Sequence, residues 1–324
     1  MRVSLRAALR RICLCVMILL ICTAGIAEDP VADPAAWPPL NEEGFLSEGE
    51  FVYADEEAGL WRYCSPTLWV EIHRRDQTKP VERWYEAEIR LAEGADGFAM
   101  KAWSETKRWT SLNYPYKIAR KYQSVFAING DFAHLRINQR QRPGILLRDG
   151  KVVSTRTKAK KNSGFPNLDT LAILPDGDLQ VFWSNEKKPE EYEAMGALDV
   201  LSFGPWLIRD GEVNEAAIKK LGREKAQRTA VGMVERGHYF CLVTEGRTKE
   251  SKGTDLAFVT EKMQALGCVN AINLDGGQSG AMIFMGRQIN LVRNQKGYRA
   301  SARKAAEILA IGTSALCAPP DAPF

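Results

Sequence analysis

The sequence predicts a strand-rich α+β fold (mixed α/β) in a single domain, with mixed sheets, several hairpins and a few covering helices. Two observations predict it. Short apolar runs rich in β-branched and aromatic residues recur along the chain, and Asp-Gly or Arg-Gly dipeptides separate several of them. Glycine supplies the positive φ angle that a tight hairpin turn needs, so these dipeptides predict hairpins. Many hairpins argue against a simple doubly wound parallel sheet.

The first segment has the features of an export signal. Several arginines precede the apolar run Ile12–Ala24, small residues lead to Ala27, and polar sequence begins at Glu28. This order is typical of a secretory signal, and the apolar run is short for a stable membrane span. We therefore expect a signal peptide over 1–27 and an exported protein that is periplasmic, extracellular or associated with the envelope, without a stable membrane span after cleavage. An uncleaved anchor is the alternative.

Charge outside the signal is balanced. The chain holds 44 Lys and Arg against 40 Asp and Glu, and four of the arginines but no acidic residue precede Glu28. The rest of the chain therefore has as many basic as acidic residues. A nucleic-acid-binding protein is expected to keep a basic excess, so we exclude that class of partner.

One domain is expected between two short ends. Residues 28–43 are rich in Pro, Ala and acidic residues and predict a flexible leader, and 317–324 predict a tail, which leaves 44–316 for the domain. The four cysteines outside the signal are Cys64, Cys241, Cys268 and Cys317. In an exported protein they allow two disulfides in any of three pairings. For the two that lie in apolar stretches, Cys241 and Cys268, a buried thiol is an equal alternative.

The elements follow in a regular order along the chain. Strands are predicted at Thr67–His73, Trp84–Leu91 and Gln123–Ile128, the last leading directly to Asn129. The hairpin dipeptides are Asp149-Gly150, Asp176-Gly177, Asp210-Gly211 and Arg236-Gly237. Short helices are predicted at Tyr114–Tyr122 and Pro189–Met195, and the clearest helix at Asp255–Leu266.

The helix over Asp255–Leu266 introduces the first candidate site. Its apolar residues recur on one helical face, Thr254 or Asp255 can cap its start, and Gly267 can end it. The strand Val269–Leu274 follows and ends in the sequence NLDGGQSGAM of residues 273–282. Loops after strands commonly carry functional residues, so this segment is a candidate site.

Two enzymatic interpretations of the segment use its acid or its serine. A serine hydrolase would use Ser279 as nucleophile with His134 as base, but a nucleophile elbow needs glycine where Ala281 stands. Asp275 could instead act as an acid, base or nucleophile next to a bound phosphate.

Two other interpretations need no catalysis. The glycines at 276 and 277 could cradle an anion with backbone N–H groups, aided by the polar side chains of Gln278 and Ser279. A structural Asp-Gly-Gly turn is equally compatible with the segment alone. A structural calcium or magnesium ion at Asp275 stays open, although no regular spacing of carboxylates follows it. No cofactor is otherwise indicated.

Five segments resemble the phosphodiester glycosidase domain family, in the order in which that family has them. They are Ala127–Phe132, Phe203–Pro205 with the turn Asp210-Gly211, Arg228–Gly232, Glu245–Arg247, and Ala265–Ser279. The resemblance covers roughly Phe51 to Gly312. The family includes the lysosomal enzyme that removes N-acetylglucosamine from a phosphodiester to uncover mannose 6-phosphate, and secreted bacterial proteins, some of them linked to exopolysaccharide.

The chain departs from the family's pattern at a few positions. Asp131 and Ala133 replace the second glycine and second phenylalanine of Asn-Gly-Gly-Phe-Phe, Gln278 replaces a third glycine, and Glu245 replaces an aspartate. The acid, the asparagine and the arginine of the pattern are kept. The departures therefore concern the shape of the substrate more than the type of reaction.

The resemblance implies hydrolysis of a sugar-1-phosphodiester, which releases the sugar and a phosphomonoester. Asp275 would be the first catalytic carboxylate and Glu245 the second, with Asp131 as an alternative partner. Arg228 would stabilise the phosphate, because a guanidinium fork can bind two phosphate oxygens.

The implied substrate is a sugar phosphate or an anionic glycan. Expected substrate contacts are Asn129, Gly130, Asp131, His134, Gly276, Gly277, Gln278 and Ser279. Two basic stretches are expected to be solvated, with an entrance that attracts anionic polymer as the alternative; they comprise Arg136, Arg140, Arg142, Lys158, Lys160 and Lys161. A non-catalytic sugar-phosphate or exopolysaccharide-binding protein is the second hypothesis, and a serine hydrolase that uses Ser279 the third.

Overall fold

The computed structural model describes residues 36–106, 111–130, 144–156, 168–184, 186–221, 224–248, 251–293 and 299–323. Trp37–Phe324 form one compact unit, and the description below concerns that unit. The predicted signal peptide, the first half of the leader, Asp131, His134 and both basic stretches lie outside the described residues.

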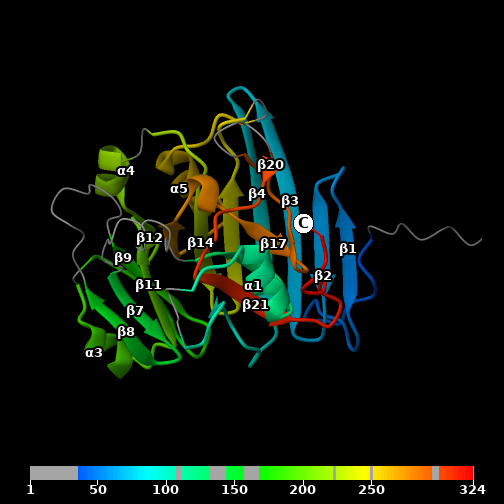
Figure 1. Ribbon diagram of the computed structural model, residues 1–324, viewed down its shortest axis with the longest axis horizontal. Helices are drawn as coiled ribbons and strands as arrows, with labels where there is room; N and C mark the ends of the chain where they lie inside the picture. The colour runs from blue at the N-terminus through cyan, green and yellow to red at the C-terminus, as the bar shows by residue number, and fades with distance from the viewer. Residues whose placement is uncertain are drawn as a thin grey trace, which may run out of the picture. The chain divides into compact units, whose positions relative to one another are not determined.

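The largest sheet has nine strands in the order β1-β2-β3-β4-β15-β14-β16-β12-β13. Its first four strands form a meander that Figure 1 shows at the right of the molecule. The strands are β1 (Phe51–Asp55), β2 (Leu60–Cys64), β3 (Leu68–Thr78), β4 (Val81–Leu91), β12 (Trp206–Arg209), β13 (Glu212–Val213), β14 (Thr229–Glu235), β15 (His238–Thr244) and β16 (Asn270–Leu274).

Two five-stranded sheets and one small ribbon contain the other strands of the described residues. The first sheet has the order β10-β9-β11-β7-β8, with β7 (Gly144–Arg148), β8 (Lys151–Arg156), β9 (Asp169–Ile173), β10 (Leu179–Phe182) and β11 (Asp199–Phe203). The second has the order β18-β17-β6-β21-β5, with β5 (Ala99–Ala102), β6 (Ser124–Asn129), β17 (Met282–Phe284), β18 (Arg287–Gln288) and β21 (Glu307–Thr313). β19 (Val292–Arg293) pairs with β20 (Arg299–Ala300).

The helices are short and cover sheet faces. α1 (Pro115–Lys121), α3 (Pro189–Ala194) and α5 (Leu256–Ala265) confirm the predicted helices, and α4 (Glu215–Leu221) was not predicted. α1 packs on β6 and β21, and Figure 1 shows it next to β21. Asp255 caps α5 by accepting a hydrogen bond from the Phe258 N–H at 2.9 Å, as expected. No helix in the described residues is long and apolar enough to cross a membrane.

The predicted strand-rich α+β class is confirmed, but the sheets are antiparallel rather than mixed in every described ladder. The physical reason lies in the turns. All four predicted dipeptides join neighbouring strands, and hairpin partners are necessarily antiparallel. Both residues of Asp149-Gly150 and of Asp210-Gly211 have positive φ, as a type I′ hairpin turn requires.

The main core lies between the inner face of the nine-stranded sheet and the two five-stranded sheets. Ile272 and Leu274 of β16 point into it, whereas Ala271 points to the other face, where α5 packs. All four cysteines are buried free thiols, so the alternative to disulfides holds. Burial raises the pKa of Cys268 and Cys317 to about 12, which leaves these thiols protonated and unreactive.

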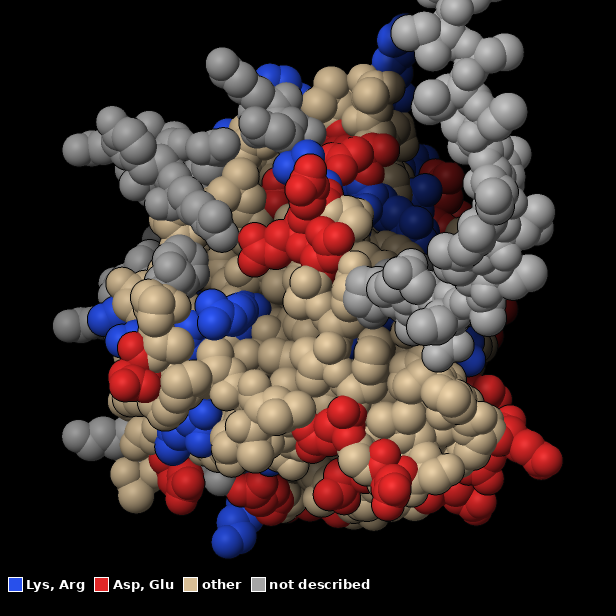
Figure 2. All heavy atoms as spheres, turned by 90° about the vertical axis from the view of Figure 1, so that its right-hand side faces the viewer, with Lys and Arg blue, Asp and Glu red and all other residues tan. Residues whose placement is uncertain are grey.

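The outer face near β1 carries charges of both signs around an uncharged centre (Figure 2). In the first four strands of the large sheet and their turns, several charges are paired, including Arg62 with Glu71 at 2.5 Å and Arg83 with Asp76 at 2.6 Å. Ion pairs that remain accessible to water contribute little to stability, so these pairs are expected to add little to the stability of the meander.

Candidate functional site

The start of β14 and the ends of β15 and β16 lie side by side at one end of the strands of the nine-stranded sheet, which is called the sheet edge below. Thr229, the first residue of β14, lies opposite Val243 of β15 and opposite Leu274, the last residue of β16. Arg228 precedes Thr229 and Asp275 follows Leu274, so both lie at this edge; Glu245, which follows β15, lies there too. Neighbouring strands are about 4.8 Å apart, which puts the backbones of Glu245 and Asp275, two strands apart, at roughly 10 Å.

Asn129 connects this edge to the second five-stranded sheet. Its side chain is 1% exposed, and its amide nitrogen donates to the backbone carbonyl of Asp275 at 2.7 Å. Its amide oxygen accepts hydrogen bonds from the Thr229 hydroxyl and from the Ala281 N–H, both at 2.9 Å. Both acceptor positions of that oxygen are therefore occupied by the protein. Asn129 fastens the loop that carries Asp275 to β14 and β17, and the segments of Asn129, Arg228 and Asp275 converge.

The Asp-Gly-Gly turn is shaped by close packing against the segment before β14. A Cβ atom on Gly276 would lie 2.1 Å from the carbonyl oxygen of Gln227, so no larger residue fits there. The N–H of Gly277 donates to the same oxygen at 3.0 Å, and the N–H of Ser279 donates to the Gly276 carbonyl at 3.0 Å. These two N–H groups are thus used within the protein rather than directed at an anion. Asp275 itself is 8% exposed.

Arg303 is a neighbour of the turn that sequence reasoning missed. Its Nε donates to the side-chain oxygen of Gln278 at 3.2 Å, and its backbone N–H donates to the Gln278 carbonyl at 2.8 Å. This contact places a guanidinium beside the loop of Asp275. No motif marked Arg303, because it follows the loop by more than twenty residues and approaches it only through the fold.

Glu245 is fully buried on the core side of the sheet edge. One carboxyl oxygen accepts the Leu291 N–H at 2.7 Å. Burial raises the pKa of the Glu245 carboxyl, and the Leu291 N–H, the Arg83 guanidinium and the Tyr85 hydroxyl oppose that rise in part. Burial and the Glu245 charge in turn raise the pKa of Tyr85. Glu245 therefore keeps its proton to a higher pH than an exposed glutamate.

Arg228 faces the opposite side of the sheet, where α5 begins. Its Nη2 donates to the Glu224 carbonyl at 2.6 Å and its Nε to the Thr254 carbonyl at 3.4 Å. Two of its five N–H groups are used in these bonds. Burial lowers the pKa of Arg228, against the opposing charges of Glu224 and Asp255.

The structure thus brings together part of the predicted site. Asn129 and the turn that carries Asp275 are in direct contact, and Arg228 and Glu245 flank them on opposite sides of the sheet edge. Gly130 packs against Met100, since a Cβ atom there would lie 2.5 Å from the methyl carbon of that residue. Within the described ranges, no cluster of three or more His, Cys, Asp or Glu side chains is arranged to hold a metal ion.

Comparison with known proteins gives a consistent result. A model of the phosphodiester glycosidase family matches residues 122–312, more than half of the chain. The human N-acetylglucosamine-1-phosphodiester alpha-N-acetylglucosaminidase is 29% identical over 151 residues, which are 42% of this chain and 29% of the human protein. The SPbeta prophage-derived uncharacterized protein YomE of Bacillus subtilis is 27% identical over 187 residues, which are 57% of this chain and 27% of YomE. The matched part therefore spans less than a third of these relatives.

A solved structure shares the fold. The catalytic domain of the zebrafish N-acetylglucosamine-1-phosphodiester alpha-N-acetylglucosaminidase, auto-inhibited by its pro-peptide, superimposes with a TM-score of 0.60 at 19% sequence identity. The alignment covers 82% of this chain and 88% of that domain. At this identity the match shows the fold alone.

Proposed function

Because this chain belongs to the phosphodiester glycosidase family, we propose that it is an exported hydrolase that cleaves a sugar-1-phosphodiester in a glycan or envelope polymer. The sugar is proposed to resemble N-acetylglucosamine. The observation that carries the proposal is the convergence of the Asn129, Arg228 and Asp275 segments at one sheet edge. These segments lie far apart in the sequence, and a shared site explains why the fold brings all three together.

The reaction proposed is a hydrolysis at the anomeric carbon. The bond between that carbon and the phosphate oxygen breaks, water supplies the new oxygen, and the products are the free sugar and a phosphomonoester. The departing phosphate oxygen is a far weaker base than the alkoxide of an ordinary sugar alcohol, so it needs less proton donation. Charge stabilisation at the phosphate is then the larger requirement.

The carboxyl groups of Glu245 and Asp275 are assigned different roles because their environments differ. Glu245 has a raised pKa because it is buried, which suits a general acid that donates a proton to the departing phosphate oxygen. Asp275 lies in the turn held by Asn129 and is assigned the role of nucleophile or of base for the attacking water. The separation of the two carboxyl groups in the substrate complex decides between retention and inversion.

Positive charge is proposed to come from two sides. Arg228 stabilises the phosphate from the α5 side, and Arg303 adds a second guanidinium beside Gln278. Asn129 is assigned a positioning role rather than a sugar contact, because the protein occupies its amide oxygen fully.

The proposal is tested with a synthetic N-acetylglucosamine-1-phosphodiester and with a UDP-sugar. Asp275→Asn is expected to lower kcat by on the order of 10³-fold, and Arg228→Ala to raise KM and lower kcat. Ser279→Ala removes only one expected substrate contact, so under this proposal it is expected to lower activity far less than Asp275→Asn. Folding of each variant is checked by circular dichroism.

Two outcomes contradict the proposal. Activity that disappears only in Ser279→Ala would identify a serine hydrolase. Saturable binding of these substrates without turnover by the wild type would identify a sugar-phosphate-binding protein.

A further inference from the structure

A cavity of about 480 Å³ lies at the end of β6 remote from Asn129. Ser124, the first residue of β6, lines the cavity and is paired with Thr313 of β21, whereas Asn129 is paired with Ile308. Five residue-to-residue steps of extended strand separate Ser124 from Asn129, a length of about 17 Å. The described lining of the cavity does not include Asp275. The cavity is therefore separate from the candidate site.

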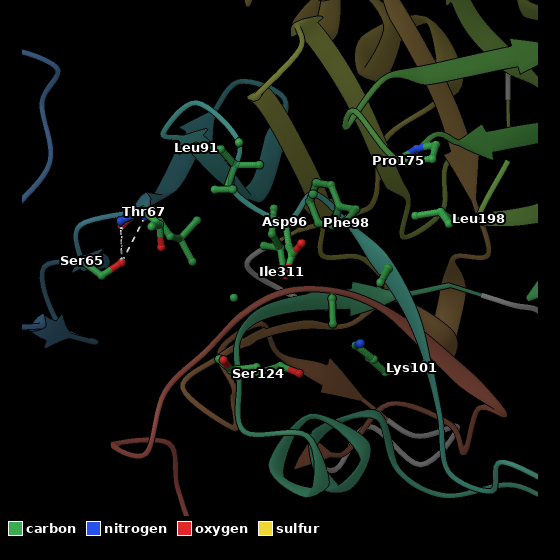
Figure 3. A pocket seen from close by; sticks show the side chains of 18 of the residues that line it. Ser65, Thr67, Leu91, Asp96, Phe98, Lys101, Ser124, Pro175, Leu198 and Ile311 are labelled. Atoms are coloured by element: carbon green, nitrogen blue, oxygen red, sulfur yellow. Dashed lines mark hydrogen bonds between the residues drawn. The ribbon is translucent and has the colours of Figure 1, made fainter. Parts of the chain in front are cut away.

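Each of the three large sheets supplies one side of this cavity. Figure 3 shows the turn between β2 and β3 on one side, the segments flanking β9 and β11 on the opposite side, and the β5–β6 region below. The labelled residues of these sides are Ser65 and Thr67, Pro175 and Leu198, and Lys101 and Ser124. Leu198 is 40% exposed, so an apolar side chain stands at the surface beside the cavity.

The wall of the cavity at Gly97 and Phe98 is held in place by residues that lie directly behind it. The Tyr239 hydroxyl donates to the Gly177 carbonyl at 2.6 Å, and its ring meets that of Phe98 edge to face at 5.2 Å. Gly97 packs so closely on Gly177 that a Cβ atom would lie 3.1 Å from the Gly177 Cα. Because these contacts hold the cavity open before a ligand binds, little conformational entropy is lost when a ligand enters it.

The lining combines apolar surface with hydroxyl groups. Leu68, Leu91 and Phe98 supply apolar surface. The Ser65 hydroxyl accepts the backbone N–H groups of the β2–β3 turn, at 3.1 and 3.3 Å. Within the part of the chain that the structure describes, no partner is recorded for the hydroxyl groups of Thr67, Ser124 and Thr313, which also line the cavity. These hydroxyl groups are available to a ligand that both donates and accepts hydrogen bonds.

The described lining of the cavity carries charges of both signs and no excess of either. Among the described residues of the lining, the charged side chains are the ammonium group of Lys101 and the carboxylate of Asp96. The Lys101 ammonium also lies 5.7 Å from the centre of the Tyr122 ring. A phosphate-binding site would instead gather several arginine or lysine side chains. The cavity therefore fits a neutral ligand that is apolar on its faces and carries hydroxyl groups on its edge, which describes a sugar ring.

We propose that this cavity binds neutral sugar residues of a glycan. The inference rests on the proposed function. The phosphodiester of the polymer reacts at the sheet edge, while sugars several residues away along the same polymer bind here. Two linked contacts raise the affinity for a polymer above that for a short substrate.

Calorimetric titration with a neutral probe, N,N′-diacetylchitobiose, tests the proposal directly. The wild type and Asp275→Asn are expected to bind the probe equally, because the cavity needs no catalysis. Thr313→Trp, which fills one side of the cavity, is expected to weaken binding by about tenfold or more. Leu198→Trp obstructs the opposite side and is expected to do the same. The matched control is Thr155→Trp, an exposed threonine of β8 outside the cavity lining.

The outcomes separate this inference from the proposed function. Binding that is lost in both cavity variants and kept in Thr155→Trp supports the inference, whether or not the wild type hydrolyses any phosphodiester. Where hydrolysis is present, the cavity variants are expected to raise KM for a polymeric substrate and leave a small one unaffected. Absence of saturable binding by the wild type overturns the inference, as does equal binding by the wild type and well-folded cavity variants. A fatty acid that binds here in place of the sugar probe also overturns it.

Discussion

At the scale of single residues, the site depends on how a few side chains are buried. Asn129 has three hydrogen-bond partners, two in the loop that carries Asp275 and one in β14. Glu245 is fully buried, and its carboxyl group accepts the Leu291 N–H. Buried polar groups of this kind are costly to disturb, because a lost partner leaves another group without a hydrogen bond. Substitutions of these residues are expected to lower both stability and activity. Denaturation measures the loss of stability, and an assay of the folded variant measures the loss of activity.

Asn129→Ala is expected to lower the free energy of unfolding by about 3 kcal/mol, since it leaves three buried groups without their partner. Urea denaturation measures the loss. The matched control is Asn41→Ala, because the exposed Asn41 side chain accepts bonds only from its own turn. Equal losses in both variants would contradict the role of Asn129 as a clamp, that is, as the residue that fastens the Asp275 loop to β14.

The raised pKa of Glu245 predicts a pH-dependent stability. The folded state holds this proton at pH values where the unfolded chain has released it, so the contribution of Glu245 is fully present below the pKa of the unfolded state. That contribution is lost as the pH rises through the higher pKa of the folded state. The advantage of the wild type over Glu245→Gln in urea denaturation is therefore expected to shrink from pH 4 to pH 8. A constant difference across that range would contradict the raised pKa.

At the scale of elements, hairpins were predicted well and the helix α4 was missed. A type I′ turn depends on two adjacent residues with positive φ, so Asp149-Gly150 and Asp210-Gly211 reveal their hairpins locally. α4 is only seven residues long and owes its position to packing against α5 rather than to a clear apolar period. The expectation of mixed sheets was wrong because strand direction depends on long-range pairing wherever no hairpin fixes it.

The two glycines of the Asp-Gly-Gly turn are expected to differ in their tolerance of a side chain. Gly276→Ala forces a Cβ atom to within 2.1 Å of the Gln227 carbonyl oxygen and should cost at least about 2 kcal/mol, with loss of activity. Gly277 has φ of +59° and open space around it, so Gly277→Ala should cost only about 1 kcal/mol. Thermal unfolding and activity assays of both variants check the order, and the reverse order would contradict the packing described here.

At the scale of the whole molecule, a buried ionic contact joins the two five-stranded sheets. Arg148 of β7 is fully buried, and its Nε donates to the carboxylate of Glu307 in β21 at 2.6 Å. Arg148 also donates to the Val200 carbonyl at 2.6 Å. Glu307 is next to Ile308, the β21 residue opposite Asn129, so this contact lies close to the clamp that holds the candidate site.

Removal of one partner from this pair is expected to lower the stability of the protein far more than removal of both partners. Arg148→Met leaves the Glu307 carboxylate buried and unpaired and should cost about 3–5 kcal/mol, whereas Arg148→Met combined with Glu307→Leu should recover much of that loss. Urea denaturation of the two single variants and the double variant gives the coupling energy. Additive losses would show that the contact contributes little.

The sequence by itself determined the strand-rich class, the hairpins and the family to which the chain belongs, because turn geometry and motif order are local properties of the chain. It also identified Asp275, Arg228, Glu245 and Asn129 as candidates. Only the tertiary structure decided that Asn129 is a clamp, since its partner Asp275 lies 146 residues away in the chain. It likewise decided that the cysteines are free thiols, that Arg303 reaches the turn and that Glu245 has a raised pKa. Burial and long-range contacts arise from the packing of the whole chain, and no local pattern encodes them.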